Sequence, residues 1–197
     1  MPFVSFLGDE KELEALMMHQ SERYQPFGAL AGHILTGPSE LPKAERETIA
    51  AYVSALNACG YCAGTHSAVA KALGMDAALV DALVTDPDNA PVDDKLRPLL
   101  AYARKITEAP SKLTQADADA VITAGWNEQT LSDLVAIAAL FAMANRLVEG
   151  HGFEALPQAM NDIAGTRMAK NGYGSPDDES VQEPTGHHTR TATNEAA

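Results

Sequence analysis

The stretch that most constrains how this chain can fold runs over residues 45–74, ERETIAAYVSALNACGYCAGTHSAVAKALG. It contains both cysteines of the protein, Cys59 and Cys62, in a C-x-x-C arrangement that is followed by His66. Asn and Gly suit helix caps and turns, so residues 57–60 predict a junction between two helices. Because residues three or four apart share one face of a helix, we expect Cys59, Cys62 and His66 to converge where the second helix begins.

A C-x-x-C pair in the first turn of a helix is suited to redox chemistry. The thiolate is the reactive form of cysteine, and a nearby His, a helix N-terminus or the C-x-x-C arrangement itself lowers the thiol pKa. The unpaired N–H groups and the positive end of the helix dipole favour a negative charge there. Cα atoms one turn apart also fall within the window of about 4.4 to 6.8 Å that a disulfide requires. The spacing therefore predicts a dithiol that can be oxidised reversibly.

Glu47 lies twelve residues before Cys59 and is the candidate partner of His66. In one unbroken helix, at a rise of 1.5 Å per residue, Glu47 would lie about 18 Å from Cys59. If the chain turns at residue 58, the second helix runs back along the first, and the depths of Glu47 and His66 differ by about 6 Å. A tilt, the long side chain or one water could close that gap. We therefore expect Glu47 to orient His66.

This pattern, E-x11-C-x-x-C-x3-H between two helices of an Ala-rich chain, resembles the AhpD-like alkyl hydroperoxidases of the carboxymuconolactone decarboxylase superfamily. The specific match covers residues 47–66, and a looser helical resemblance covers residues 10–165. The resemblance implies an all-α fold, an AhpD-like helical bundle with the C-x-x-C at the start of a helix. It also implies an antioxidant peroxidase in which Cys62 attacks the peroxide, Cys59 resolves it, and Glu47 and His66 form a proton relay.

The resemblance also implies the partners of the protein. They are a small hydroperoxide as substrate, an external dithiol reductant, and further copies of the chain in a homo-oligomer, a trimer or a hexamer. No cofactor and no metal is implied. One position departs from the family pattern, because well-known members have a His before the second cysteine and this chain has Tyr61. A phenol ordinarily titrates near 10, unlike an imidazole, and whether Tyr61 lines the pocket stays open.

Three interpretations of the dithiol stay open: redox catalysis, a structural or regulatory zinc site, and inert core thiols. Zinc prefers four protein ligands, and with Cys59, Cys62 and His66 only three are local, so Glu47 would have to be the fourth. General thiol chemistry would as readily select Cys59 as the nucleophile, because it lies closer to the helix N-terminus. Two other functions also stay open, a non-catalytic helical protein that responds to redox state or metal, and an acid/base enzyme of the carboxymuconolactone decarboxylase type.

The composition favours helices and disfavours some partners. Hydrophobic residues make up 46% of the 197 residues but aromatic residues only 6%, which suits closely packed helices better than a β-sandwich. The net charge of -13 argues against nucleic acid and against anionic membranes. The N-terminus does not resemble a signal peptide, and the longest apolar run, residues 134–144, is shorter than the roughly 20 residues that span a bilayer. We expect a soluble cytoplasmic protein, where C-x-x-C is typical of redox or metal sites.

Caps, breakers and apolar spacing outline the helices. Residues 24–26, which end in Pro26, are expected to break the first helix, Asp76 is expected to cap a later one, and Thr114 with Asp117 has capping-box spacing. Residues 1–169 are expected to form one AhpD-like helical domain, and residues 170–197, rich in Gly, Pro, Ser and Thr, a disordered acidic tail. The expected helices cover residues 9–18, 27–35, 42–56, 59–74, 76–84, 93–108, 114–125 and 130–149.

Four further polar residues could line a pocket: His33, Asn145, Arg146 and His151. The favoured interpretation of His33 is core packing or surface exposure. Arg146 is expected to reach solvent or an acidic partner, because long cationic side chains extend to water. A place on the pocket wall stays open for all four.

Overall fold

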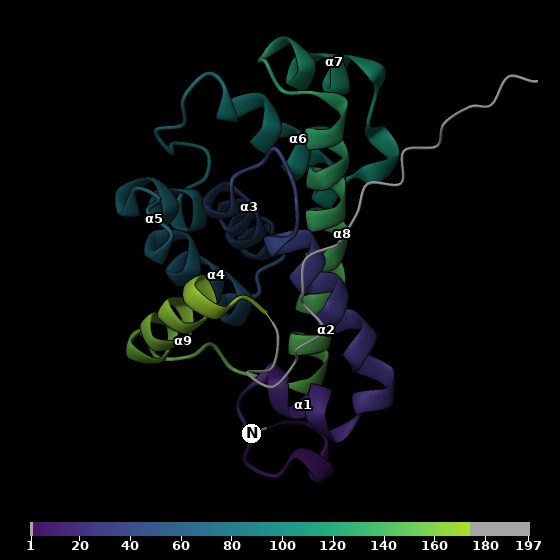
Figure 1. Ribbon diagram of the computed structural model, residues 1–197, viewed down its shortest axis with the longest axis vertical. Helices are drawn as coiled ribbons and strands as arrows, with labels where there is room; N and C mark the ends of the chain where they lie inside the picture. The colour runs from purple at the N-terminus through teal and green to yellow at the C-terminus, as the bar shows by residue number, and fades with distance from the viewer. Residues whose placement is uncertain (1, 174–197) are drawn as a thin grey trace, which may run out of the picture.

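The computed structural model describes residues 2–173, and in that part of the chain the secondary structure is entirely helical, without a strand (Figure 1). The prediction of an all-α fold is therefore confirmed. The elements in chain order are η1 Ser5–Leu7, α1 Leu13–His19, α2 Ser21–Thr36, α3 Lys43–Leu56, α4 Gly60–Ala72, α5 Ala77–Thr85, α6 Leu96–Glu108, η2 Pro110–Lys112, α7 Gln115–Thr123, α8 Glu128–His151 and α9 Gln158–Asn171.

The α3–α4 hairpin lies at the centre of the molecule (Figure 1). α3 is buried along most of its length, and it packs against α4 and α8. The predicted junction at residues 57–60 is confirmed, although its left-handed residue is Ala58, with φ 56°. The Ala58 N–H donates to Ala55 O at 2.9 Å and the Cys59 N–H donates to Ser54 O at 2.9 Å. This pair of bonds is a Schellman motif, which ends α3 and fixes the backbone of Cys59 directly before α4.

α8 is the long helix that runs beside α2, α3 and α6 (Figure 1). Of the helices in residues 2–173, it alone is long and apolar enough to cross a membrane by length and composition. Its buried side chains, among them Leu134, Ile137 and Phe141, face the core shared with α3 and α6. Of its most apolar 18-residue window, 44% is buried inside the described part of the molecule.

The predicted break at Pro26 is wrong. Pro26 lies inside α2, and the chain instead breaks at Gln20, with φ −126° and ψ 51°, between α1 and α2. Proline removes one helical hydrogen bond, which leaves the carbonyl four residues earlier without a donor. Pro26 and Glu22 are both exposed, so water can hydrogen-bond that carbonyl. Tyr24, which the prediction placed in the break, and Phe27, which it placed at the start of the next helix, are both buried.

Both predicted helix caps are confirmed. The Leu79 N–H donates to Asp76 Oδ1 at 2.8 Å at the start of α5. Thr114 and Asp117 form a capping box at the start of α7, in which the Thr114 N–H donates to Asp117 Oδ2 at 2.7 Å. These contacts are local in sequence, which is why the residue spacing was sufficient to predict them.

α9 is the helix that the sequence pattern did not predict. It packs closely along α4, because a Cβ on Gly165 would lie 2.7 Å from the carbonyl carbon of Ala68. The expected start of the tail, residue 170, falls in the last turn of α9, and the chain continues as packed structure to Tyr173. The rest of the predicted tail, residues 174–197, lies outside the described residues.

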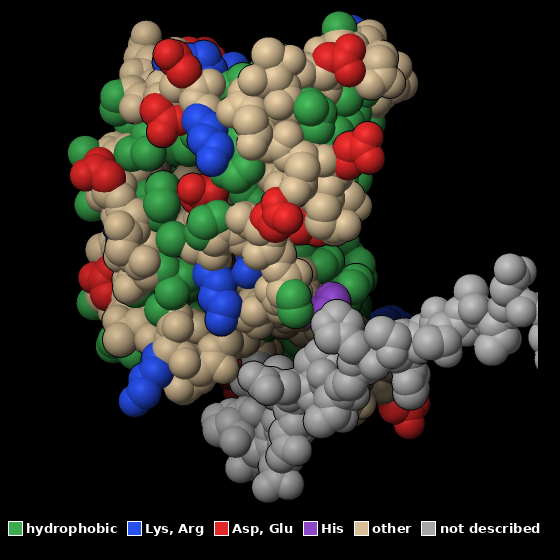
Figure 2. Space-filling model, turned by 45° about the horizontal axis from the view of Figure 1, so that its top comes forward, with side chains coloured by type: hydrophobic (Ala, Val, Ile, Leu, Met, Phe, Trp, Pro, Cys, Tyr) green, Lys and Arg blue, Asp and Glu red, His purple; other side chains and the backbone are tan. Residues whose placement is uncertain are grey.

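Apolar side chains also lie on the surface. Figure 2 shows hydrophobic side chains spread over one face among scattered acidic and basic ones. The most exposed large ones are Phe3 at 77%, Met18 at 74% and Ile163 at 72%.

Candidate active site

The two cysteines are free thiols and lie buried at the start of α4. Cys59 is the N-cap residue and is 0% exposed, and Cys62 lies in the first turn and is 3% exposed. The Schellman motif at the end of α3 places the first sulfur, and the helical turn of α4 places the second beside it. In the structure the pair therefore lies at a helix N-terminus, where the spacing predicts it.

The two thiols act on each other in opposite directions. A hydrogen bond with the Cys62 thiol lowers the pKa of Cys59, against the effect of burial. The same hydrogen bond, together with burial and the Cys59 charge, raises the pKa of Cys62 far above its ordinary value. The contact between the two thiols therefore favours ionisation of Cys59 over ionisation of Cys62.

Glu47 and His66 form a direct, buried pair. Their contact joins His66 Nδ1 and Glu47 Oε2 at 2.7 Å. His66 is 8% exposed and Glu47 is 1% exposed. The packing of α3 on α4 thus closes the gap of about 6 Å in depth that a simple hairpin leaves. With the Nδ1–H donating to the carboxylate, Nε2 is the nitrogen that can accept a proton. The ring of Phe141 contacts the imidazole edge-on, with centroids 4.5 Å apart, and fixes its plane.

Tyr173 completes this cluster, and the sequence analysis missed it. Its hydroxyl lies 2.6 Å from Glu47 Oε1 and 2.7 Å from Glu47 Oε2, and 3.1 Å from His66 Nδ1. Its ring stacks on the imidazole at a centroid distance of 5.9 Å. Burial and the Glu47 charge raise the pKa of Tyr173 well above its ordinary value, so the phenol is a proton donor here. The only signal in the sequence is one aromatic residue between two glycines, in a segment that otherwise looks like a tail.

Of the four polar residues left open, the structure brings Asn145 to the dithiol. Asn145 is 2% exposed, its Nδ2 donates to Ser54 Oγ at 3.0 Å, and its Oδ1 accepts from Asn57 Nδ2 at 2.9 Å. A hydrogen bond from the same amide to the Cys62 thiol acts to lower the pKa of Cys62. Asn145 therefore ties α8 to the junction that holds the sulfurs.

The other three residues lie away from this site. His33 is exposed, and Arg146 is exposed and donates to Ala142 O at 2.6 Å. His151 uses Nδ1 to contact Leu147 O at 2.7 Å, one turn earlier in α8.

Tyr61 has a structural contact rather than a place in the Glu47–His66 cluster. Its hydroxyl accepts a hydrogen bond from the Leu13 N–H at 3.1 Å, at the start of α1, and its ring packs on Phe153. Burial raises the pKa of Tyr61 to about 12.

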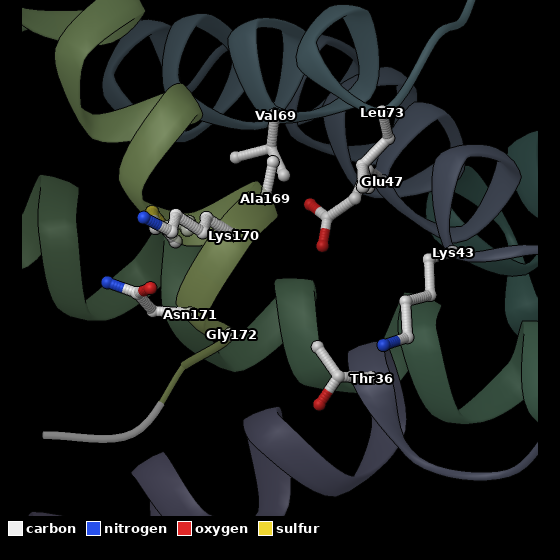
Figure 3. Close-up of a pocket in the computed structure, with 10 residues that line it drawn as sticks. Thr36, Lys43, Glu47, Val69, Leu73, Ala169, Lys170, Asn171 and Gly172 are labelled. Carbon is white, nitrogen blue, oxygen red and sulfur yellow. The ribbon is translucent and has the colours of Figure 1, made fainter. Parts of the chain in front are cut away.

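A cavity of about 240 Å³ opens next to Glu47 (Figure 3). The Glu47 carboxylate points into it from α3, and Lys43 extends toward Thr36 at its edge. The end of α9, with Lys170, Asn171 and Gly172, forms the opposite wall. The Glu47 carboxylate therefore lies at the wall of a cavity rather than inside continuous packing.

Within residues 2–173, no group of three His, Cys, Asp or Glu side chains is arranged to hold a metal ion. The contact of 2.7 Å between His66 Nδ1 and Glu47 Oε2 pairs the two residues that a zinc site would need as its third and fourth ligands beside the cysteines.

Comparison with known proteins places this arrangement in context. A model of the carboxymuconolactone decarboxylase family matches residues 22–105, which include Glu47, both cysteines and His66 but neither Asn145 nor Tyr173. None of the curated proteins compared with the chain matches it.

Several solved structures share the fold. An uncharacterized peroxidase-related protein from Silicibacter sp. TM1040 is 30% identical, with 75% of this chain and 76% of that chain covered and a TM-score of 0.69. An uncharacterized peroxidase-related protein from Ralstonia eutropha JMP134, with an alkylhydroperoxidase AhpD core, is 24% identical, covers 77% of this chain and 79% of that chain, and has a TM-score of 0.71. A variant of the debrominase Bmp8 in complex with 2,3,4-tribromopyrrole is 22% identical over 76% of this chain and 80% of that chain, with a TM-score of 0.63.

Proposed function

The chain belongs to the carboxymuconolactone decarboxylase family, and we propose that within it the protein is a thiol-dependent hydroperoxidase. The observation that carries the proposal is a free dithiol at the start of α4, one turn before a His66–Glu47 pair with a contact of 2.7 Å. A nucleophile, a base and a group that orients the base are the parts that covalent catalysis by a thiol requires.

The first step is attack by Cys62 on the peroxide. His66 Nε2 takes the proton of the Cys62 thiol, and Glu47 stabilises the imidazolium that forms. The Cys62 thiolate attacks the outer oxygen of the hydroperoxide, the O–O bond breaks, and Cys62 becomes a sulfenic acid. The proton returns from His66 to the departing alkoxide, which leaves as an alcohol, or as water from hydrogen peroxide. The raised pKa of Cys62 is the reason that this thiol needs a base.

The second step is resolution by Cys59. Cys59, as a thiolate, attacks the Cys62 sulfur to form the disulfide. The hydroxyl of the sulfenic acid leaves with a proton as water. An external dithiol then reduces the disulfide by thiol exchange, is itself oxidised to a disulfide, and restores both thiols.

The test is peroxide turnover by single-cysteine variants. We expect Cys62→Ser to abolish turnover, and Cys59→Ser to consume about one equivalent of peroxide and to accumulate a sulfenic acid, because the resolving thiol is missing. Ser67→Ala is the matched control, since it removes a buried hydroxyl without a partner beside His66. The reverse pattern for the two cysteines would exchange their roles, and wild-type protein without peroxidase activity would refute the proposal.

Two alternatives give different results in the same experiments. An acid/base enzyme of the decarboxylase type would stay active after both cysteines are replaced. A non-catalytic redox-responsive protein would change its elution on size exclusion with dithiothreitol and show no peroxidase activity.

The remaining parts of the proposal concern the setting of the reaction. We place the protein in the cytoplasm, where dithiol reductants keep such a pair reduced. A homo-oligomer, a trimer or a hexamer, would bury the exposed apolar side chains such as Met18 and Ile163.

A further inference from the structure

We propose that Tyr173 is a positioning residue of the Glu47–His66 relay, supplied by the segment that follows α9. The inference rests on the proposed function and adds to it a residue outside the region that matches the family model, residues 22–105. Tyr173 is separated from Glu47 by 126 residues, yet its hydroxyl lies 2.6 and 2.7 Å from the two carboxylate oxygens.

Two helices, α9 and α2, hold the segment that carries Tyr173 in place. α9 ends at Asn171, and the Gly172 N–H donates to Met168 O at 2.8 Å. Gly172 has φ 75°, a conformation that favours glycine, and it turns the chain toward the site. A Cβ on Gly172 would lie 3.7 Å from the Thr36 methyl group, so the turn also contacts the end of α2. The position of the phenol therefore depends on the packing of α9 and α2.

The buried carboxylate needs the phenol as a hydrogen-bond donor. Within the described residues Glu47 has no ion pair with a Lys or Arg, and its only hydrogen-bond partners are His66 and Tyr173. The His66 contact uses Oε2, so within residues 2–173 Tyr173 is the only donor to Oε1. A buried carboxylate oxygen without a partner is unfavourable, and without the phenol the carboxylate would turn toward another donor. Tyr173 thus keeps the Glu47 carboxylate aligned toward Nδ1 of His66.

Stacking adds a second constraint on the base. The Tyr173 and His66 rings are nearly parallel, at an interplanar angle of 10°, while Phe141 meets the imidazole at 83°. The two aromatic rings fix the imidazole plane, and the Tyr173 hydroxyl fixes the carboxylate. Tyr173→Phe removes only the second effect, which makes it the variant of choice.

The experiment compares Tyr173→Phe with Tyr102→Phe, a half-buried tyrosine of α6 whose hydroxyl has no hydrogen bond in the described part of the chain. We expect Tyr173→Phe to lower kcat/KM for peroxide about tenfold, the usual scale for one lost hydrogen bond to a charged group. The KM for the dithiol reductant should not change, and Tyr102→Phe should match the wild type. In a Glu47→Gln background, Tyr173→Phe should have little further effect, because both residues act through His66.

A second readout does not depend on peroxidase activity. The ionisation of Tyr173, followed by NMR of ring-labelled tyrosine, should move to lower pH in Glu47→Gln, because the Glu47 charge contributes to the raised pKa of Tyr173. In a Cys59→Ser background, where Cys62 is the one remaining thiol of the chain, the rate of iodoacetamide reaction should fall in Tyr173→Phe, since the base that deprotonates Cys62 is less well aligned.

The outcomes separate the two proposals. If the wild type lacks peroxidase activity but Tyr173→Phe still slows alkylation, the proposed function fails and the role of Tyr173 stands. If the wild type is an active peroxidase and Tyr173→Phe leaves both kcat/KM and alkylation unchanged, the role of Tyr173 is refuted. Equal losses for Tyr173→Phe in the wild-type and Glu47→Gln backgrounds would also refute it.

Discussion

At Cys59 two neighbouring groups act on one thiol in opposite directions. The Cys62 thiol lowers the pKa of Cys59, whereas a hydrogen bond and the charge of Glu149 raise it. Glu149 is exposed at the C-terminal end of α8, so an exposed carboxylate acts on this buried sulfur. The pKa of the resolving thiol is therefore set partly by a residue that the C-x-x-C pattern does not include.

We expect Glu149→Gln to lower the pKa of Cys59, because the substitution removes the negative charge that disfavours the thiolate. Reaction of the reduced protein with iodoacetamide at neutral pH should become about two- to fivefold faster. Glu128→Gln, which removes the same charge from the exposed opposite end of α8, should leave the rate unchanged. A slower reaction in Glu149→Gln would show that the carboxylate activates the thiol instead.

The sequence was sufficient to identify the residues of one helical hairpin. Glu47, Cys59, Cys62 and His66 follow from spacing, because helix geometry relates positions within α3 and α4. Tyr173, by contrast, reaches Glu47 across 126 residues, and no local periodicity relates the two. Such contacts depend on how whole helices pack, so the sequence pattern could not predict them.

At the scale of elements, the α4–α9 contact depends on small residues. Besides the close approach of Gly165 to Ala68, a Cβ on Gly64 would lie 2.6 Å from Asn161 Nδ2. Asn161 is buried, accepts a hydrogen bond from Thr65 Oγ1 at 3.2 Å and donates to Leu156 O at 3.3 Å. These contacts set the position of α9, and through Gly172 they set that of Tyr173.

Gly165→Ala should displace α9, because the nearest atoms to the new methyl group belong to the backbone and Cβ of Ala68. We expect a loss of about 1 to 3 kcal/mol in unfolding free energy, measured by urea denaturation. Peroxide turnover should fall at least as far as in Tyr173→Phe, since the phenol moves with the helix. Gly150→Ala in α8, where the added methyl group meets open space, should be neutral or slightly stabilising. A fully stable and active Gly165→Ala variant would contradict the link between α9 and the site.

The differences between predicted and observed elements have physical causes. Proline usually ends helices, but at Pro26 solvent can satisfy the unpaired carbonyl, so burial of Tyr24 and Phe27 decides the outcome. α9 has only two buried residues, Asn161 and Gly165, and so presents no apolar stripe in its sequence. Its stability comes from close backbone packing on α4, which hydrophobic periodicity does not report.

At the scale of the whole molecule, the fold buries several tyrosine hydroxyls and cysteine thiols in apolar packing. Burial raises the pKa of Tyr52 and raises the pKa of Tyr61 to about 12. The hydrogen bond with Cys59, together with burial, raises the pKa of Cys62. Tyr173, on Glu47, belongs to the same group. In the unfolded chain these groups ionise near their ordinary values, so at alkaline pH the folded state holds more protons than the unfolded state. Cys59, whose pKa is lowered, acts in the opposite sense.

Alkaline pH should therefore destabilise the protein steeply. The contribution of a group with a raised pKa is fully present below its unfolded value and is lost as pH rises toward its folded value, which for Tyr61 is the window from about 10 to about 12. Each such group lowers the unfolding free energy by about 1.4 kcal/mol per pH unit within its window. Urea denaturation of the reduced protein across this range should show the decline, and Tyr61→Phe should reduce the slope of unfolding free energy against pH by the contribution of about one group.

Tyr61→Phe also removes the acceptor of the Leu13 N–H. The variant should therefore be less stable than the wild type at neutral pH, and its stability should approach that of the wild type as pH rises. Parallel curves for the two proteins would mean that Tyr61 ionises in the folded state as readily as in the unfolded chain.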